Sequence, residues 1–452
     1  MIYTRAWRGK RYAVLGLARS GLATINALIA GGAHVTAWDS DAERVQALRS
    51  RYQVEGDPAN TWTISLETSG SIDFADPLEM DLTGFDGIVV SPGVPLNTHP
   101  IRAHAATAHV PIIGDVELFA EARADLPPHK VVGITGTNGK STTTALIDHI
   151  CRTVGLPSLA GGNIGLPILS HDPLAPNDTG AGVYVLELSS YQIDLTFSLD
   201  CDVAVLLNLT PDHLDRYDGF EGYAASKARL FAMQSPEHAA VIGIGDAPSA
   251  AIARSLSKRG EHLTKIAPGF CMDQSRWPAL QGPHNAQNAL AAISACEALG
   301  IDNASIDKGL ETFPGLPHRM ERVATKNGVL FVNDSKATNA DSTAPALSAY
   351  PRIHWILGGK AKTNDLDACR PGFPHVARAY TIGEAGSMFA ELLAPDLPVE
   401  ECGTLEAAVK SAAANAQPGD TVLLSPACAS FDQFRDYEAR GQAFRDAVAA
   451  LT

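Results

Sequence analysis

A glycine-rich turn between an apolar run and a helical pattern constrains the fold of this chain more than any other feature. The run KVVGITG at 130–136 is typical of a buried strand, and a helical pattern extends from about Ser141 to Arg152. Successive backbone N–H groups in the intervening turn, together with the helix N-terminus, form a binding site for phosphate groups. The sequence therefore predicts a strand, turn and helix that bind a nucleotide.

The turn departs at one position from the general phosphate-loop pattern G-x-x-x-x-G-K-[ST]. That pattern requires glycine at position 134, where this chain has Ile134, with Gly133 and Gly136 on either side. Lys140 is expected to neutralise the β- and γ-phosphates, and Ser141 to offer its hydroxyl to Mg²⁺. The alternative is an ordinary surface turn, and the predicted strand and helix beside it argue against that interpretation.

Length and composition limit the class of protein to which this chain can belong. A chain of 452 residues exceeds what one hydrophobic core usually supports, so two to four domains are expected. The hydrophobic fraction of 45% is typical of globular proteins, and no run approaches the roughly eighteen apolar residues of a membrane span. A formal charge of −15 argues against broad binding to nucleic acid or anionic lipid. We therefore expect small-molecule partners, and we expect any anionic ligand to be bound by a local group of residues and not by a broad basic surface.

The cysteines favour a reducing compartment. Seven of them are scattered along the chain without a C-x-x-C pair, which argues against a disulfide framework and against a zinc site. The N-terminal apolar stretch is broken by glycine and arginine, so we interpret it as a first strand and not as a signal sequence. The expected location is the cytoplasm, and a monomer is expected.

Short β-rich runs alternate with helical patterns along the whole chain, which is typical of parallel α/β sheets. We predict three α/β domains: a Rossmann-like domain at 1–113, a P-loop ATPase-like domain at 114–313 and a second Rossmann-like domain at 314–452. The predicted strands are 11–17, 33–39, 87–93, 130–136, 182–190, 203–209, 329–335, 353–359, 377–383 and 420–426, and the clearest helices besides the one after the turn are near 20–30 and 285–299.

Acidic and basic side chains follow the apolar strands of the central region. Glu187 ends an apolar run, at a strand end where a carboxylate can face a phosphate site. Asp212 and His213 follow the next apolar run. A lone histidine is more often structural than functional, and His213 is as consistent with a site residue as with a structural one. Lys227, from its helical surroundings alone, would be a surface lysine.

The first domain contains GLARSG at 16–21, with Asp39 further on, which is similar to a dinucleotide-binding fingerprint. The second glycine of G-x-G-x-x-G is Ala18 here, so close approach of a pyrophosphate is less certain. Arg19 is either a cation for a pyrophosphate or an exposed arginine at a helix start. Taken alone, this domain would suggest an oxidoreductase.

In sequence order, the motifs of the whole chain resemble those of the Mur ligase superfamily. The last two resemble the branch that adds D-glutamate to UDP-N-acetylmuramoyl-L-alanine. The motifs are GITGTNGKST, GGNIG (161–165), LELSSYQ (186–192), NLTPDHLDRY (208–217), the Lys227 segment, GPHNAQNALAA (282–292), GLPHRME (315–321), NDSKATN (333–339) and SPACASFDQF (425–434).

This resemblance implies an ATP- and Mg²⁺-dependent ligase of cytoplasmic peptidoglycan synthesis, and thus a role in cell wall biogenesis, cell shape and cell division. It implies that the substrate carboxylate is activated as an acyl phosphate, which the amine of D-glutamate then attacks. The third domain is expected to close over ATP. The stereochemistry of the amino acid rests on the resemblance alone.

The resemblance also implies roles for individual residues. Lys140, His213 and Lys227 would be catalytic, and Lys227 would be carbamylated. Two Mg²⁺ ions would be held by Ser141 and Glu187, and by His213 and Lys227. ATP would contact Gly136, Thr137, Asn138, Gly139, Lys140, Ser141, Asn285, Arg319 and Asp334. The UDP substrate would contact Arg19, Ser20, Asp39, Ser40, Ser91, Pro92, Gly93 and Asn163. D-Glutamate would contact Thr338, Lys362, Ser430, Phe431 and Tyr437, with Lys336 close by.

Three other functions remain open from the residues. A P-loop phosphotransferase or NTPase would use the same turn without an amino acid. A dinucleotide-dependent oxidoreductase would use the first domain and would not need Lys140. A regulatory homologue without activity is disfavoured by the intact Lys140, Glu187, His213 and Lys227. The phosphotransferase and the oxidoreductase both leave the segment 425–434 unexplained.

Overall fold

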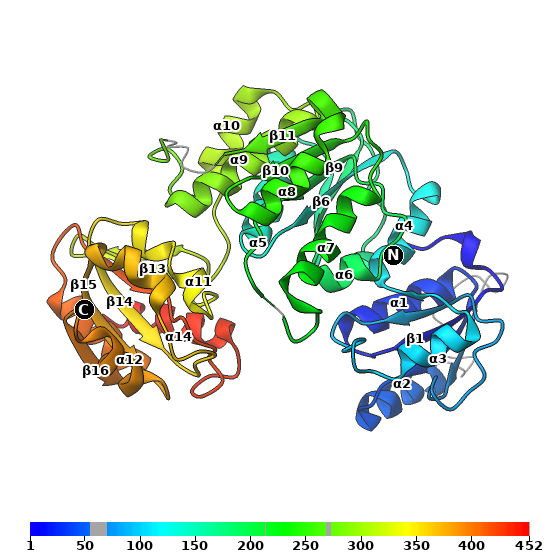
Figure 1. Cartoon of the computed structure of the whole chain (residues 1–452), viewed down its shortest axis with the longest axis horizontal. Helices are drawn as coiled ribbons and strands as arrows, with labels where there is room; N and C mark the ends of the chain where they lie inside the picture. Colours follow the sequence, from blue (N-terminus) through cyan, green and yellow to red (C-terminus); the bar gives the residue numbers. More distant parts are fainter. Residues whose placement is uncertain (55–69, 213, 268–272, 452) are drawn as a thin grey trace. The chain divides into compact units, whose positions relative to one another are not determined.

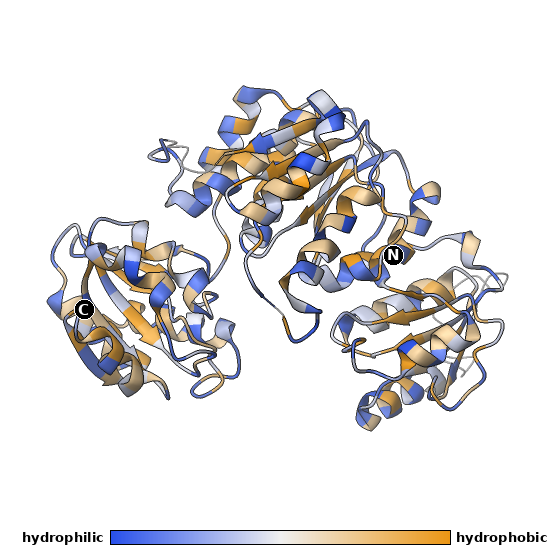
Figure 2. Ribbon diagram, in the orientation of Figure 1, coloured by the Kyte–Doolittle hydropathy of each residue, from blue (hydrophilic) through white to orange (hydrophobic). Residues whose placement is uncertain are grey.

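The computed structural model describes residues 1–54, 70–212, 214–267 and 273–451. Three β-sheets account for the strands of these ranges, and helices flank the strands of each sheet (Figure 1). Apolar residues concentrate on the strands, whereas the helices carry both hydrophobic and hydrophilic residues (Figure 2). The predicted α/β class is therefore confirmed.

The first sheet is parallel, with the strand order β3-β2-β1-β4-β5. The chain order reverses between β1 and β4, and ligands of open α/β sheets bind at such a point. Its strands are β1 (Arg11–Leu15), β2 (His34–Trp38), β3 (Ser71–Phe74), β4 (Gly87–Val90) and β5 (Ile112–Ile113), and its helices are α1 (Arg19–Ala30), α2 (Ala42–Val54) and α3 (Ile101–Ala108).

The second sheet is also parallel, with the order β11-β10-β9-β6-β8-β7. The strand that precedes the glycine-rich turn, β6, lies between β8 and β9, so the residues after these two strands flank the turn. The strands are β6 (His129–Thr135), β7 (Ser158–Gly162), β8 (Gly182–Glu187), β9 (Val203–Leu206), β10 (Ala239–Gly243) and β11 (Leu263–Ile266), and the helices include α4 (Asp115–Ala122), α5 (Lys140–Thr153), α6 (Ser190–Asp194), α7 (Gly219–Ala232) and α8 (Ala247–Ser255).

The third sheet has the order β12-β13-β17-β14-β15-β16 and is parallel except for the β12–β13 pair. Its strands are β12 (Glu321–Lys326), β13 (Val329–Asn333), β14 (Ile353–Gly358), β15 (Val376–Ile382), β16 (Val399–Gly403) and β17 (Thr421–Leu424). The helices of this region are α11 (Ala340–Thr343), α12 (Gly386–Leu393), α13 (Leu405–Asn415) and α14 (Tyr437–Ala449). Two further helices, α9 (Pro283–Ala298) and α10 (Asn303–Thr312), come between β11 and β12 in the chain.

The chain forms two compact units, which are described separately below. The first unit comprises 1–268 and 291–306, and the second comprises 269–290 and 307–452. The first two sheets share one hydrophobic core within the first unit, which runs from Val14 and Val35 to Leu186 and Leu206. A helix long and apolar enough to cross a bilayer is not found among the described residues.

Every predicted strand is present, although most end two or three residues earlier than predicted. The prediction missed β3, β5, β7, β10, β11, β12 and β16. Most of these strands are short, lie toward the sheet edges or alternate with polar residues, which weakens their pattern. The exception is β10, whose sequence AAVIG is a continuous apolar run. The edge strand β7, with the sequence SLAGG, contains two glycines, which are unfavourable in strands and weaken the pattern.

Candidate active site

The glycine-rich turn has the predicted strand-turn-helix geometry. Strand β6 ends at Thr135 and α5 begins at Lys140. Gly136 and Gly139 have φ angles of 148° and 87°, which favour glycine. A Cβ on Gly136 would lie 3.1 Å from the Cβ of Leu207, so the neighbouring segment also limits this position to glycine. The turn is therefore held in one narrow conformation.

Asn208, two residues after β9, fixes this turn. The backbone N–H of Thr137 donates to Asn208 O at 2.9 Å, and that of Asn138 donates to Asn208 Oδ1 at 2.9 Å. The Asn208 amide donates back to Asn138 O at 3.2 Å. The sequence analysis did not single out Asn208, because its role depends on β9 lying beside β6, and this sheet order is not visible in the spacing.

Lys140 lies over the turn that precedes it. Its Nζ donates to Gly136 O at 2.9 Å and to Thr137 O at 2.8 Å. Ser141, in the first turn of α5, is 5% exposed. A cation beside a glycine-rich turn at a helix N-terminus is the arrangement that binds the phosphates of a nucleotide.

Glu187 and Asn163 meet at the carboxyl edge of β8. The Asn163 side chain donates to Glu187 Oε1 at 2.8 Å, and Asn163 N donates to Glu187 O at 2.8 Å. Glu187 is 2% exposed, and its Oε2 is buried without a hydrogen-bond partner in the described part of the chain. Burying a carboxylate oxygen without a partner costs free energy, and a bound cation would offset that cost. This atom is therefore suited to be a cation ligand.

Lys227 is buried, so the interpretation of it as a surface lysine is wrong. It is 1% exposed, and its Nζ donates to Thr135 Oγ1 at 3.3 Å and lies 4.8 Å from the centre of the Tyr223 ring. Burial, and next the charge of Lys140, lower the pKa of Lys227 well below its usual value, against the opposing effect of nearby carboxylates. These two effects favour the neutral amine.

Four residues are predicted to bind metal: Ser141, Glu187, His213 and the buried Lys227. Glu187 has a donor atom suited to a cation, and Ser141 lies near the start of α5. His213 lies outside the described residues. Among the residues that the structure describes, no group of three or more His, Cys, Asp or Glu side chains is arranged to hold a metal ion.

The turn at the carboxyl end of β1 requires two glycines. Gly16 has a φ of 96°, and a Cβ on Gly21 would lie 1.8 Å from Gly16 O. Asp39 accepts from the backbone N–H of Leu17 at 2.6 Å and of Asp41 at 2.9 Å. Burial alone would raise the pKa of Asp39, but these N–H groups and a nearby arginine lower it overall. Asp39 therefore supports the turn as a carboxylate.

The remaining residues predicted for the UDP substrate lie around this turn. Ser91, after β4, donates through Oγ to Gly16 O at 3.0 Å and, with Ser20, lines a small hollow against α1. Arg19 and Ser40 are exposed. A Cβ on Gly93 would have open space around it. Asn163 lies instead on the second sheet, beside Glu187.

Asp115, at the start of α4, lines the same hollow and was missed by the sequence analysis. It is 3% exposed, its Oδ1 has no hydrogen-bond partner in the described ranges, and burial raises its pKa to about 6. An acid at a helix start is so common that the sequence carried no signal for a buried one.

In the second unit, Asp334 follows β13 and is 7% exposed. It accepts from Ser425 Oγ at 2.8 Å and from Met320 N at 3.2 Å. Burial raises the pKa of Asp334 to about 7, although these hydrogen bonds and the charge of Arg319 act in the opposite direction. The hydrogen bond between Asp334 and Ser425 therefore connects two segments that are distant in the sequence, 333–339 and 425–434.

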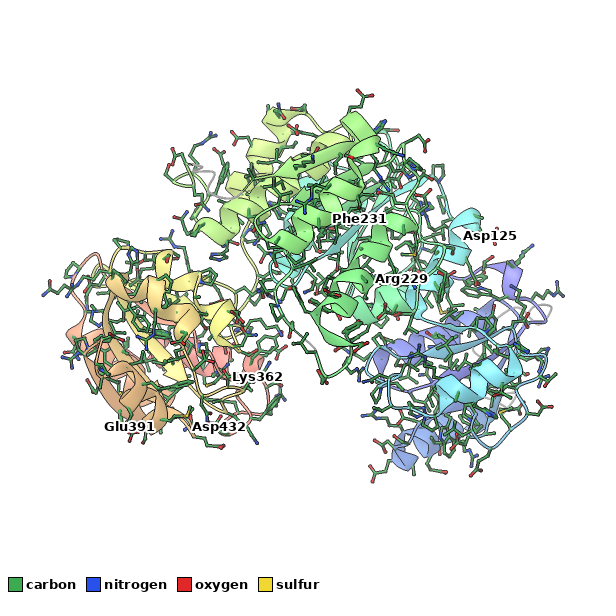
Figure 3. All side chains as sticks on the ribbon, viewed as in Figure 1. Asp125, Arg229, Phe231, Lys362, Glu391 and Asp432 are labelled. Carbon is green, nitrogen blue, oxygen red and sulfur yellow. The ribbon has the colours of Figure 1, made fainter. Side chains whose placement is uncertain are left out.

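The residues predicted for the amino acid lie on neighbouring segments of the same unit. Lys336 Nζ lies 4.2 Å from the centre of the Tyr437 ring, at the start of α14. Ser430 is buried, whereas Phe431 is 70% exposed. Thr338 is half-buried, and Lys362 is exposed on the segment after β14 (Figure 3).

Arg440 of α14 holds these segments together and was also missed. Its guanidinium is 1% exposed and donates to Ser335 Oγ at 3.0 Å, Ser335 O at 2.9 Å and Cys428 O at 3.0 Å. Burial lowers the pKa of Arg440 to about 10. Sequence separations of more than a hundred residues hide its contacts with Ser335 from pattern analysis.

Asn285, predicted to contact adenine, lies on α9 and is 4% exposed. Its side chain donates to Gln281 O at 3.0 Å and accepts from the Asn288 amide at 3.1 Å. The Asn285 side chain is thus hydrogen-bonded both to the segment before α9 and to Asn288 within the helix.

Two domain families match the chain. The Mur ligase middle domain matches residues 134–269, and the Mur ligase glutamate ligase domain matches residues 318–428. The first match covers the glycine-rich turn and most of the second sheet, and the second covers most of the third sheet.

Curated relatives align along the whole chain. A UDP-N-acetylmuramoylalanine–D-glutamate ligase of Novosphingobium aromaticivorans is 61% identical, and the alignment covers 100% of this chain and 97% of the relative. The protein of the same name from Zymomonas mobilis is 54% identical, with 100% of both chains covered.

Solved structures share the fold at low identity. A UDP-N-acetylmuramate-alanine ligase from Thermotoga maritima matches with a TM-score of 0.56 at 15% identity, covering 98% of this chain and 99% of that one. A pseudomurein peptide ligase from Methanothermus fervidus matches with a TM-score of 0.53 at 17% identity, covering 98% and 100%. From its full-length identity to the curated relatives and its two matching domains, this chain belongs to the Mur ligase family.

Proposed function

We propose that this chain is an ATP- and Mg²⁺-dependent ligase that adds D-glutamate to UDP-N-acetylmuramoyl-L-alanine in cytoplasmic peptidoglycan synthesis. The observation that carries the proposal is the grouping of Lys140, Glu187 and Lys227 at the carboxyl edge of β6 and β8. The choice of D-glutamate is supported by the names of the relatives at 54% and 61% identity.

The reaction has two steps. A carboxylate oxygen of the L-alanyl group attacks the γ-phosphorus of ATP, the bond to the β-phosphate oxygen breaks, and ADP leaves. The amine of D-glutamate then attacks the carbonyl carbon of the acyl phosphate, phosphate leaves, and the amine gives up a proton. Lys140 binds the β- and γ-phosphates, because its ammonium lies over the turn that receives them.

Ser141 and Glu187 would hold Mg²⁺, which neutralises the negative charge that otherwise keeps the substrate carboxylate away from the γ-phosphate. Glu187 Oε2 is the atom that supports this assignment, because it is buried and unpaired in the described chain. We propose His213 and Lys227 as ligands of a second ion. A neutral amine is the form that adds CO₂, and burial favours that form at Lys227, which supports its carbamylation.

The substrates divide between the sheets. The turns after β1 and β4 would hold the UDP group, with Arg19, Ser20, Asp39, Ser40 and Gly93 as contacts, and Asn163 would lie nearer the reacting carboxylate. Thr338, Lys362, Ser430, Phe431 and Tyr437 would hold D-glutamate, and Asn285, Arg319 and Asp334 would contact ATP. We propose domains at 1–113, 114–313 and 314–452, and a monomeric enzyme.

The test is an assay of the purified chain with ATP, Mg²⁺ and UDP-N-acetylmuramoyl-L-alanine, against D-Glu, L-Glu, D-Asp, L-Lys and diaminopimelate. Release of phosphate and formation of the amide are measured together. Amide formation with D-Glu alone supports the proposal. Amide formation with another amino acid would overturn the substrate, and phosphate release independent of any amino acid would point to an NTPase.

A further inference from the structure

Arg216 connects the first two sheets and has no role in the function described above. It lies between β9 and α7, three residues before the start of α7. Its Nη2 lies 3.4 Å from the carbonyl oxygens of Pro92 and Gly93 and 3.2 Å from that of Val94. These three residues form the turn after β4, so one guanidinium from the second sheet donates to three successive carbonyls of the first.

An aromatic ring covers one face of the Arg216 guanidinium. It lies 4.6 Å from the centre of the Tyr191 ring, and Tyr191 stacks on Tyr217 with an interplanar angle of 8°. The Tyr217 hydroxyl donates to Asp194 Oδ2 at 2.8 Å, which orients that ring. The stacked rings therefore limit the rotamers available to Arg216.

A second contact joins the same two segments. The Asn97 side chain donates to Asp215 O at 2.9 Å, next to Arg216 in the sequence. Exposed arginines usually pair with carboxylates, whereas Arg216 is half-buried and donates to backbone carbonyls. Its planar group of several N–H donors suits this geometry, and the single ammonium of lysine does not.

We propose that Arg216 is a positioning residue that fixes the distance between the turn at 91–94, which holds the UDP group, and the phosphate-binding edge of the second sheet. The inference rests on the proposed function. A nucleotide-sugar carrying an L-alanyl carboxylate must reach both places at once, so a small change in their separation misaligns the whole substrate. UDP alone contacts only the first sheet and is insensitive to that separation.

The test compares the binding of UDP-N-acetylmuramoyl-L-alanine with that of UDP by calorimetry without ATP. Arg216→Lys keeps the charge and loses the three-carbonyl geometry. We expect its affinity for the whole substrate to fall about tenfold, and its affinity for UDP to stay within about twofold. Asn97→Ala removes no charge. It should also lower the affinity for the whole substrate, by a smaller factor, and leave the affinity for UDP unchanged.

Arg229→Lys is the matched control. Arg229, labelled in Figure 3, also lies over an aromatic ring, at 5.1 Å from the centre of Phe197, and donates to Thr196 O at 2.9 Å. All three residues belong to the region of the second sheet. Both affinities should be unchanged in this variant. Melting temperatures of all variants show whether each one is folded.

Three results would overturn the inference. Arg216→Lys could weaken the binding of UDP and of the whole substrate equally, or it could weaken neither. Arg229→Lys could weaken the binding of the whole substrate but not that of UDP. If Arg216→Lys does not fold, Asn97→Ala decides, and unchanged whole-substrate binding in that variant contradicts the inference. A wild-type chain that binds the whole substrate but forms no amide overturns the proposed function alone.

Discussion

The Nζ of Lys227 donates to the Oγ1 of Thr135 at 3.3 Å, although the two residues are 92 positions apart in the sequence. Thr135 is the last residue of β6, directly before the glycine-rich turn at 136–139. The buried amine of Lys227, on α7, therefore lies beside the end of β6, the strand that precedes the turn. Lys140 lies close enough to lower the pKa of that amine, so the two lysines share one electrostatic environment.

Lys227→Met should separate activity from stability. Methionine has a similar volume without the buried amine, so the free energy of unfolding should stay equal or rise by on the order of 1 kcal/mol. Amide synthesis should fall by on the order of 100-fold or more. Urea unfolding and the ligation assay measure the two effects.

The pH dependence gives a control for this variant. The unfolded chain binds the Lys227 proton more tightly, because the pKa of Lys227 is lowered in the fold. The wild type should therefore gain stability relative to Lys227→Met as pH rises toward 10.5, the ordinary value. A variant that is destabilised at every pH would contradict the account of a strained, buried amine.

Gly136→Ala should abolish ATP binding. The new Cβ would lie 3.1 Å from the Leu207 Cβ, at a φ of 148° that costs other residues about 1–3 kcal/mol. Gly93→Ala is the matched control, because its Cβ would meet open space. ATP binding by calorimetry should be lost in the first variant and unchanged in the second. Equal ATP affinities in the two variants would show that the turn does not bind the nucleotide.

Glu187→Gln tests the cation site. The neutral amide can still accept from the Asn163 side chain, so the fold should be retained. We expect the Mg²⁺ concentration at half-maximal rate to rise, and the maximal rate to fall on the order of 100-fold, because the variant loses a charged ligand. A rate that falls without any change in Mg²⁺ dependence would assign Glu187 a different role.

Asp334→Asn should alter how stability depends on pH. The pKa of Asp334 is about 7 in the fold and 3.8 ordinarily, so the folded chain binds this proton more tightly. Its contribution to stability is full below 3.8 and is lost as pH rises to about 7. Between about pH 5 and pH 8, wild type should lose on the order of 2 kcal/mol relative to the variant. Parallel pH profiles of unfolding would contradict a buried, protonated Asp334.

The sequence predicted the features that depend on local patterns. The turn at 136–140 lies between a strand and a helix, and both have strong periodic signals. Glu187 could be placed at a strand end for the same reason. The three α/β groups followed from the alternation of apolar runs and helical patterns.

Contacts between distant segments could not be predicted in this way. Asn208 reaches the turn because β9 pairs with β6, and Arg440 reaches Ser335 across 105 positions of sequence. Lys227 was assigned a role only through resemblance, since a lysine in a helical pattern is normally solvated. Arg216 lies within the motif at 208–217, but its contacts could not be predicted, because its acceptors are backbone carbonyls and carry no residue identity.

Transfer of oxygen from substrate to phosphate tests the central claim most directly. UDP-N-acetylmuramoyl-L-alanine labelled with ¹⁸O in the alanyl carboxylate would be converted with ATP, Mg²⁺ and D-glutamate, and the released phosphate analysed by mass spectrometry. If the phosphate-binding turn delivers the γ-phosphoryl group to the carboxylate, each phosphate carries one ¹⁸O atom from it. Amide formation with unlabelled phosphate would contradict this account.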